Sequence, residues 1–188
     1  SAGDRAQAVG LLKQLTESDP LSFEGWMSRT RLAELAEPIA ALQVPAPLAS
    51  APPQLPESVQ LLHRLGLDEW AEKEFSKREG DLYGTGADRY RSLCEAYSQV
   101  QAGRRRFLLG YSAARQNQFY TAPEDASRWV WECLYPTPYA PFVKQAAVER
   151  GVPSSFIYAV MRQESGFRPA VRSPADAFGL MQIIEPTA

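Results

Sequence analysis

The sequence is poor in the residues that many catalytic and metal sites need. Its 188 residues include one histidine, His63, and two cysteines, Cys94 and Cys133. A lone histidine inside the leucine-rich segment "VQLLHRLG" is more often structural than part of a Ser-His-Asp or Cys-His site. The cysteines lie in distant segments and form no Cys-x-x-Cys motif, so a disulfide bond and two free buried thiols both stay open. Because no glycine-rich phosphate loop occurs either, we expect no cofactor and no metal ion.

Strong charge and long apolar runs are missing as well. The net charge is −2 and the pI is about 5.6, which gives no indication of a nucleic-acid partner. The one basic cluster, at residues 104–106, precedes an apolar run and predicts a solvated helix start. No apolar run has the length of a membrane span, so we expect no transmembrane segment. The first residues do not resemble a signal peptide, so they do not indicate the compartment.

The pattern of the chain predicts an all-α protein. Residues are 45% hydrophobic, enough for a substantial core, and no alternation of apolar and polar residues is long enough to predict a strand. We expect N-terminal helices in 1–43, a proline-rich connector in 44–56, and a superhelix of stacked helix pairs in 57–133. Gly66, Gly80 and Gly103 are predicted to end helices. A segment of different character, punctuated by prolines, occupies 134–188.

A carboxylate in line with a hydrophobic stripe marks that last segment. Ile157, Val160, Met161 and Glu164 are spaced i, i+3, i+4 and i+7, and share one face of a predicted helix that Ser154 or Ser155 would cap. Apolar surroundings would hold a carboxyl protonated and make it a general acid. The alternative is that Glu164 lies at the end of the helix and reaches water, as most helical glutamates do.

The residues from Tyr135 onward resemble the catalytic domain of the soluble lytic transglycosylases, lysozyme-like enzymes that cleave bacterial peptidoglycan. The resemblance is carried by "YPTPY" and by "YAVMRQESGFRPAVRSPADAFGLMQIIEPTA". The segment "LGLDEWAEKEF" also resembles, more weakly, the helical superhelix that precedes this domain in large members. The resemblance implies that residues 134–188 are the first part of a lysozyme-like domain.

The resemblance implies the chemistry of a single carboxylate. Glu164 would protonate the glycosidic oxygen between N-acetylmuramic acid and N-acetylglucosamine, and would then act as a base while the muramoyl 6-hydroxyl closes a 1,6-anhydro ring. The substrate-binding residues implied are Ser165, Ser173, Gly179, Met181 and Gln182. On pattern alone Ser173 could be a helix cap, Met181 a core residue, and Ser165 a hydrogen-bond partner of the helix end. Asp176 and Glu185 match no catalytic position of the family and are predicted to lie at the surface.

The implied partner is peptidoglycan, with cell-wall enzyme complexes as further partners, and the implied compartment is the periplasm. An export signal is then expected upstream of Ser1. Two other functions stay open: a lysozyme-type muramidase that uses Glu164 and water, and a non-catalytic helical scaffold that binds glycan or protein.

The family domain extends further than the resemblance does here, and includes a tyrosine that closes the groove. We therefore expect residues 1–188 alone to be inactive. In that case the segment after Glu164 is expected to be mobile or to pack on another molecule. Its exposed apolar patch would consist of Phe178, Leu180, Met181, Ile183 and Ile184.

Overall fold

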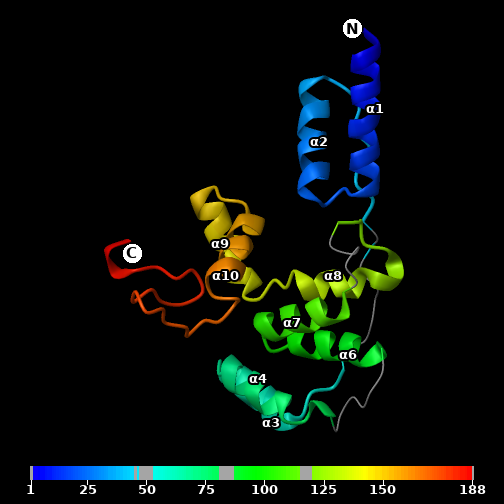
Figure 1. The fold of residues 1–188 in the computed structure, drawn as a ribbon. Helices are drawn as coiled ribbons and strands as arrows, with labels where there is room; N and C mark the ends of the chain where they lie inside the picture. Colours follow the sequence, from blue (N-terminus) through cyan, green and yellow to red (C-terminus); the bar gives the residue numbers. More distant parts are fainter. Residues whose placement is uncertain (1, 45, 47–52, 81–86, 115–119, 188) are drawn as a thin grey trace. The chain divides into compact units, whose positions relative to one another are not determined.

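The computed structural model describes residues 2–44, 46, 53–80, 87–114 and 120–187. In these ranges it contains nine α-helices and no β-strand, which confirms the prediction of an all-α protein for this part of the chain (Figure 1). The helices are α1 (Ala2–Ser18), α2 (Phe23–Glu34), α3 (Glu57–Arg64), α4 (Asp68–Ser76), α6 (Ala87–Ser98), α7 (Gly103–Ala113), α8 (Arg128–Leu134), α9 (Ala140–Arg150) and α10 (Ser154–Glu164).

The chain forms two compact units. Unit 1 comprises Ser1–Ala49 and Ala113–Trp131, and unit 2 comprises Ser50–Ser112 and Glu132–Ala188. The domain boundaries and the superhelical stacking expected from the sequence stay predictions.

Unit 1 is built around the helix pair α1 and α2, which pack side by side (Figure 1). Ser22 caps α2, because its hydroxyl accepts a hydrogen bond from the backbone N–H of Gly25 at 2.9 Å. The helix ends at Glu34, and Ala36 adopts a positive φ of 56°. The chain therefore leaves the helix before it reaches Pro38.

Unit 2 contains one of the three predicted glycine stops. Gly66 follows the end of α3 with a φ of 72°, a conformation that glycine adopts without steric cost. The other two predictions are wrong, because α4 already ends at Ser76 and α6 at Ser98. Gly103 instead begins α7, where a Cβ atom would lie 2.8 Å from Cγ of Pro138 and 3.0 Å from Cβ of Phe167. This glycine permits a close approach between segments.

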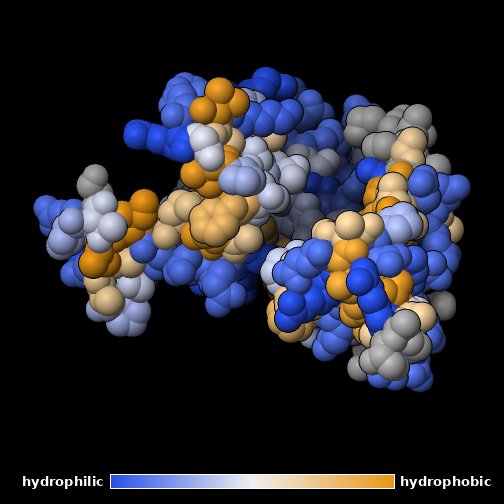
Figure 2. Space-filling model, turned by 90° about the horizontal axis from the view of Figure 1, so that it is seen from above, coloured by the Kyte–Doolittle hydropathy of each residue, from blue (hydrophilic) through white to orange (hydrophobic). Residues whose placement is uncertain are grey.

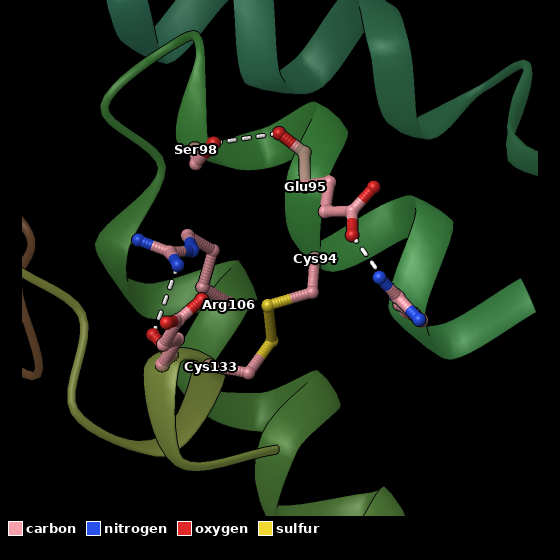
Figure 3. The surroundings of a disulfide bond; sticks show 7 residues. Cys94, Glu95, Ser98, Arg106 and Cys133 are labelled. Atoms are coloured by element: carbon pink, nitrogen blue, oxygen red, sulfur yellow. Dashed lines mark hydrogen bonds and ion pairs between the residues drawn. A yellow bond between two sulfur atoms is a disulfide. The ribbon is translucent and has the colours of Figure 1, made fainter. Parts of the chain in front are cut away.

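A disulfide bond between Cys94 on α6 and Cys133 on α8 resolves the alternatives that the sequence left open (Figure 3). Both side chains are buried. Beside the bond, a guanidinium nitrogen of Arg106 on α7 donates to the carbonyl oxygen of Glu132 at 2.9 Å (Figure 3). The bond and this contact together hold α6, α7 and the end of α8 against one another.

An ionic network is buried beside the same helices. Glu79 is only 6% exposed and accepts hydrogen bonds from Arg105 and from the hydroxyl of Tyr97. The Tyr97 ring meets that of Phe75 edge to face, with centroids 4.8 Å apart. Because the carboxylate is paired and hydrogen-bonded, the cost of burying it is offset.

The surface of the molecule includes many large hydrophobic side chains (Figure 2). Phe142 on α9 is 73% exposed and Trp70 on α4 is 62% exposed. None of the helices described here combines the length and the apolar character that crossing a bilayer requires.

Candidate active site

The candidate site is built on α9, α10 and the segment that follows them. Gly151 ends α9 with a positive φ of 63°. The next helix begins at Ser154 after Pro153, which occupies the N-cap position without a side-chain hydrogen bond. The prediction that Ser154 or Ser155 caps the helix is therefore wrong. Proline at this position still orders the helix start, because its ring restricts the backbone.

Glu164 is the last residue of α10, and its side chain is exposed. The expectation that apolar surroundings enclose this carboxyl is wrong for the residues described, and the alternative in which it reaches water holds. The reason lies in the turn that follows, where Gly166 and Phe167 have φ values of 56° and 64°. These left-handed conformations reverse the chain, so that Phe167 and not Glu164 continues the apolar face of the helix.

A small core supports the end of α10. Val143 from α9, Met161 from α10 and Phe167 are all buried in it. Leu180 and Met181, from the segment further along, pack against this core and are partly buried. The sequence predicted that Met181 lines a groove, with a core position as the alternative. The packing of Met181 agrees with the core position.

Ser165 is buried and bonded to the helix end. It is 1% exposed, and its hydroxyl donates to the carbonyl oxygen of Met161 at 2.9 Å. Its own carbonyl accepts a hydrogen bond from Nε of Arg168 at 2.9 Å. In this conformation the hydroxyl therefore stabilises the end of α10, one of the two roles considered from the sequence.

Ser173 organises a tight turn. Its hydroxyl oxygen accepts the backbone N–H groups of Ala175 at 3.2 Å and Ala177 at 3.1 Å. Its backbone N–H donates to the carbonyl of Ala177 at 2.9 Å. Because the hydroxyl oxygen already accepts two hydrogen bonds, the hydroxyl proton remains available for donation to a ligand.

Gly179 and Gln182 close the loop next to that turn. The N–H of Gly179 donates to the carbonyl of Val171 at 3.0 Å. The side-chain amide of Gln182 donates to the carbonyls of Val171 at 3.1 Å and Gly179 at 2.9 Å. Three predicted site residues, counting Ser173, are therefore joined by one hydrogen-bonded loop, residues 171–182, while Glu164 and Ser165 lie at the end of α10.

The predicted apolar patch is present in part. Phe178, Ile183 and Ile184 are 53%, 45% and 40% exposed. We expected Leu180 and Met181 to belong to this patch as well, but they pack instead against the core that supports the end of α10.

The two other carboxylates considered from the sequence are both exposed, as predicted. Asp176 forms an ion pair with Arg172, whose guanidinium also lies over the Phe178 ring at 4.8 Å from its centroid. Glu185 begins a short 3-10 helix, Glu185–Thr187.

A groove of about 780 Å³ borders this core within unit 2. It is lined by the start of α4, by α9 and α10, and by Pro169, Leu180 and Met181. Tyr139 also lines it, and burial, with a smaller effect of Asp68 and other nearby carboxylates, raises the pKa of its phenol to about 12. The contribution of α4 was not predicted, since no signal in the sequence connects residues 66–70 with the segment after residue 134.

Among the described residues, no group of three or more acidic, histidine or cysteine side chains is arranged to hold a metal ion.

A protein-family model matches the C-terminal part of the chain. Residues 141–188, which comprise nearly all of α9, all of α10 and the loop, match the transglycosylase SLT domain family. The chain is similar to the membrane-bound lytic murein transglycosylase C of Photorhabdus laumondii, with 44% identity over 50 residues, and to that of Yersinia enterocolitica, with 48% identity over 50 residues. Each alignment covers 27% of this chain and 14% of the relative, so the chain spans only a small part of the length of these relatives.

Proposed function

We propose that this protein is a peptidoglycan lytic transglycosylase, with Glu164 as its acid and then its base. The bond cleaved is the β-1,4 bond between N-acetylmuramic acid and N-acetylglucosamine, and the product carries a 1,6-anhydro-muramoyl end. The observation that carries the proposal is the match of residues 141–188 to a transglycosylase SLT domain, with Glu164 at the end of α10 inside the matched segment.

The proposed reaction needs one carboxyl group. The protonated Glu164 gives its proton to the glycosidic oxygen, the bond from the muramoyl anomeric carbon to that oxygen breaks, and the N-acetyl group of the substrate stabilises the positive sugar. The carboxylate then takes the proton of the muramoyl 6-hydroxyl as that oxygen bonds to the anomeric carbon. No water is consumed, and the intramolecular attack gains from high effective concentration.

The exposure of Glu164 fits this scheme once substrate is bound. A glycan strand laid over the end of α10 would remove water from the carboxyl, and desolvation favours the protonated acid. The buried groups Ser165 and Phe167 fix the backbone on which the carboxyl is carried. We therefore propose that the substrate itself supplies part of the apolar environment that the sequence led us to expect.

The loop 171–182 is proposed to bind the sugar beside the acid. Ser173 would donate its free hydroxyl proton to the N-acetyl group, since its oxygen already accepts two backbone N–H groups. Gly179 would allow the backbone to approach the sugar, and Met181 would contact its apolar face. Gln182 would act mainly through the loop, because its amide holds the carbonyls of Val171 and Gly179.

The proposed place of action is the periplasm, where peptidoglycan lies. The disulfide between Cys94 and Cys133 supports an oxidising compartment, because such bonds persist outside the reducing cytosol. The helices of residues 57–133 are proposed to form the superhelical scaffold, with peptidoglycan strands as the partner and cell-wall enzyme complexes as further partners.

A second candidate, hydrolysis of the same bond in the manner of a lysozyme, is favoured by the exposure of Glu164, which leaves the carboxyl open to water. Mass spectrometry of muropeptides, after incubation of the full-length protein with purified sacculi, separates the two. Anhydro-muramoyl ends are expected, whereas free reducing ends would establish hydrolysis. Binding without any cleavage would instead indicate a glycan-binding scaffold.

A further inference from the structure

Arg162, two residues before Glu164, is held between two aromatic rings. Its guanidinium carbon lies 4.5 Å from the ring centroid of Phe107 on α7 and 5.1 Å from that of Tyr135 in the segment after α8. A planar guanidinium stacks favourably on aromatic faces, more so where the site is partly removed from water. The last turn of α10 is thereby connected to a helix that precedes the matched domain in sequence.

The start of α7 makes a second contact with the same turn. Gly103 lies so close to Phe167 that a Cβ atom on the glycine would approach Cβ of Phe167 to 3.0 Å. One of the terminal guanidinium nitrogens of Arg104 is 3.0 Å from the position that a Cβ atom would take on Gly166. Residues on both sides of Glu164 thus rest on the first turns of α7.

The backbone of Arg162 also takes part in the turn. Its carbonyl oxygen accepts the N–H of Gly166 at 3.2 Å, while the carbonyl of Met161 accepts the N–H groups of Ser165 at 3.2 Å and Phe167 at 3.3 Å. A shift of Arg162 would therefore move the turn that ends the helix, and with it the carboxyl of Glu164.

We propose that Arg162 is a positioning residue for Glu164, which uses the Phe107 and Tyr135 rings to fix the last turn of α10 on α7. The inference rests on the proposed function, because it assigns Glu164 the acid role. In this proposal, the helices before residue 141 contribute to catalysis as well as forming a scaffold. Arg162 itself touches no reacting atom in this proposal.

The test compares five variants of the full-length protein: Arg162→Ala, Arg162→Lys, Phe107→Leu, Tyr135→Leu and Tyr135→Phe. Turnover on sacculi and KM are measured for each. Arg150→Ala is the matched control, because Arg150 is an exposed arginine in the last turn of the neighbouring helix α9. Thermal unfolding followed by circular dichroism checks that each variant is folded.

Arg162→Ala is expected to lower kcat on the order of ten- to a hundredfold with little change in KM, since small displacements of a reacting group cost rates of this size. Arg162→Lys should recover part of the loss because it keeps the cation. Tyr135→Phe should stay near wild type because it keeps the ring, and Tyr135→Leu and Phe107→Leu should not. Wild-type kcat in a folded Arg162→Ala variant would overturn the inference.

Hydrogen exchange separates this inference from the proposed function. The amides of Ser165, Gly166 and Phe167 should exchange on the order of ten times faster in Arg162→Ala than in wild type or Arg150→Ala, because the turn opens more often. This readout does not require activity. A wild-type protein that cleaves no glycan would refute the proposed function and with it the catalytic part of the inference, but not the hold of Arg162 on the turn, which exchange reports. Unchanged exchange at these amides would refute the positioning role alone.

Discussion

Cys94 on α6 is covalently bonded to Cys133 on α8, with their Cα atoms 5.8 Å apart and a sequence separation of 39. A cross-link that closes a loop of this length restricts the unfolded chain and stabilises the folded protein by about 4 kcal/mol in the chain-entropy account. The chain segment between the two cysteines contains α7, the helix against which the candidate site packs.

We expect the double variant Cys94→Ala, Cys133→Ala to lose about 2–4 kcal/mol of unfolding free energy, measured by urea denaturation under oxidising conditions. A reducing agent should lower the stability of the wild type toward that of the variant. The variant itself should be insensitive to the reducing agent. Equal stability of both proteins without reductant would show that the bond contributes nothing.

Gly110→Ala is predicted to destabilise the protein. A Cβ atom on Gly110 in α7 would lie 2.7 Å from the backbone nitrogen of Leu134 and 2.9 Å from Cβ of Cys133. Overpacking of this kind costs about 1–3 kcal/mol. Gly10→Ala in α1 is the matched control, because nothing lies within 4 Å of its added Cβ atom and alanine favours the helix. Thermal unfolding should show a lower midpoint for the first variant and an unchanged or higher one for the second.

Stability is predicted to fall at alkaline pH, with a contribution from Tyr139. Burial first, and nearby carboxylates second, raise the pKa of its phenol from 10.0 in the unfolded chain to about 12. The unfolded chain therefore loses this proton first, so the contribution is fully present below pH 10.0 and is lost as the pH rises through about 12. Tyr139→Phe should flatten this part of the stability profile, measured by urea denaturation between these pH values. An identical profile in both proteins would contradict the assignment.

Ser173→Ala is expected to slow glycan cleavage by about ten- to a hundredfold, the loss typical of one hydrogen bond to a developing charge. Ser155→Ala, at an exposed position on α10, is the control. Turnover and the urea midpoint are measured together. An unchanged rate with a lowered midpoint would show that Ser173 only holds the turn around Ala177.

Local sequence signals predicted part of this fold well. The stop at Gly66 was predicted from the left-handed conformation that glycine favours at a helix end. Gly103 carried the same local signal and was misassigned, because its role depends on Pro138 and Phe167, which are distant in sequence. The pairing of the two cysteines could not be predicted for the same reason.

The environment of Glu164 shows the limit of the helical pattern. The spacing correctly put it on the face of Ile157 and Met161, yet that face is buried only as far as Met161. The positive φ angles at Gly166 and Phe167 turn the chain directly after the helix and bring Phe167 into the core instead. Periodicity describes the faces of a helix but does not indicate what covers its last turn.

The central claim is tested most directly by Glu164→Gln in the full-length protein. The amide keeps the shape of the side chain but can neither donate nor recover the proton. Circular dichroism should be unchanged, because Glu164 is exposed at the end of α10. Mass spectrometry of sacculi digests should show anhydro-muropeptides released by the wild type and none above background by the variant. Release by the folded variant at about a tenth of the wild-type rate or more would contradict a mechanism that depends on this single acid.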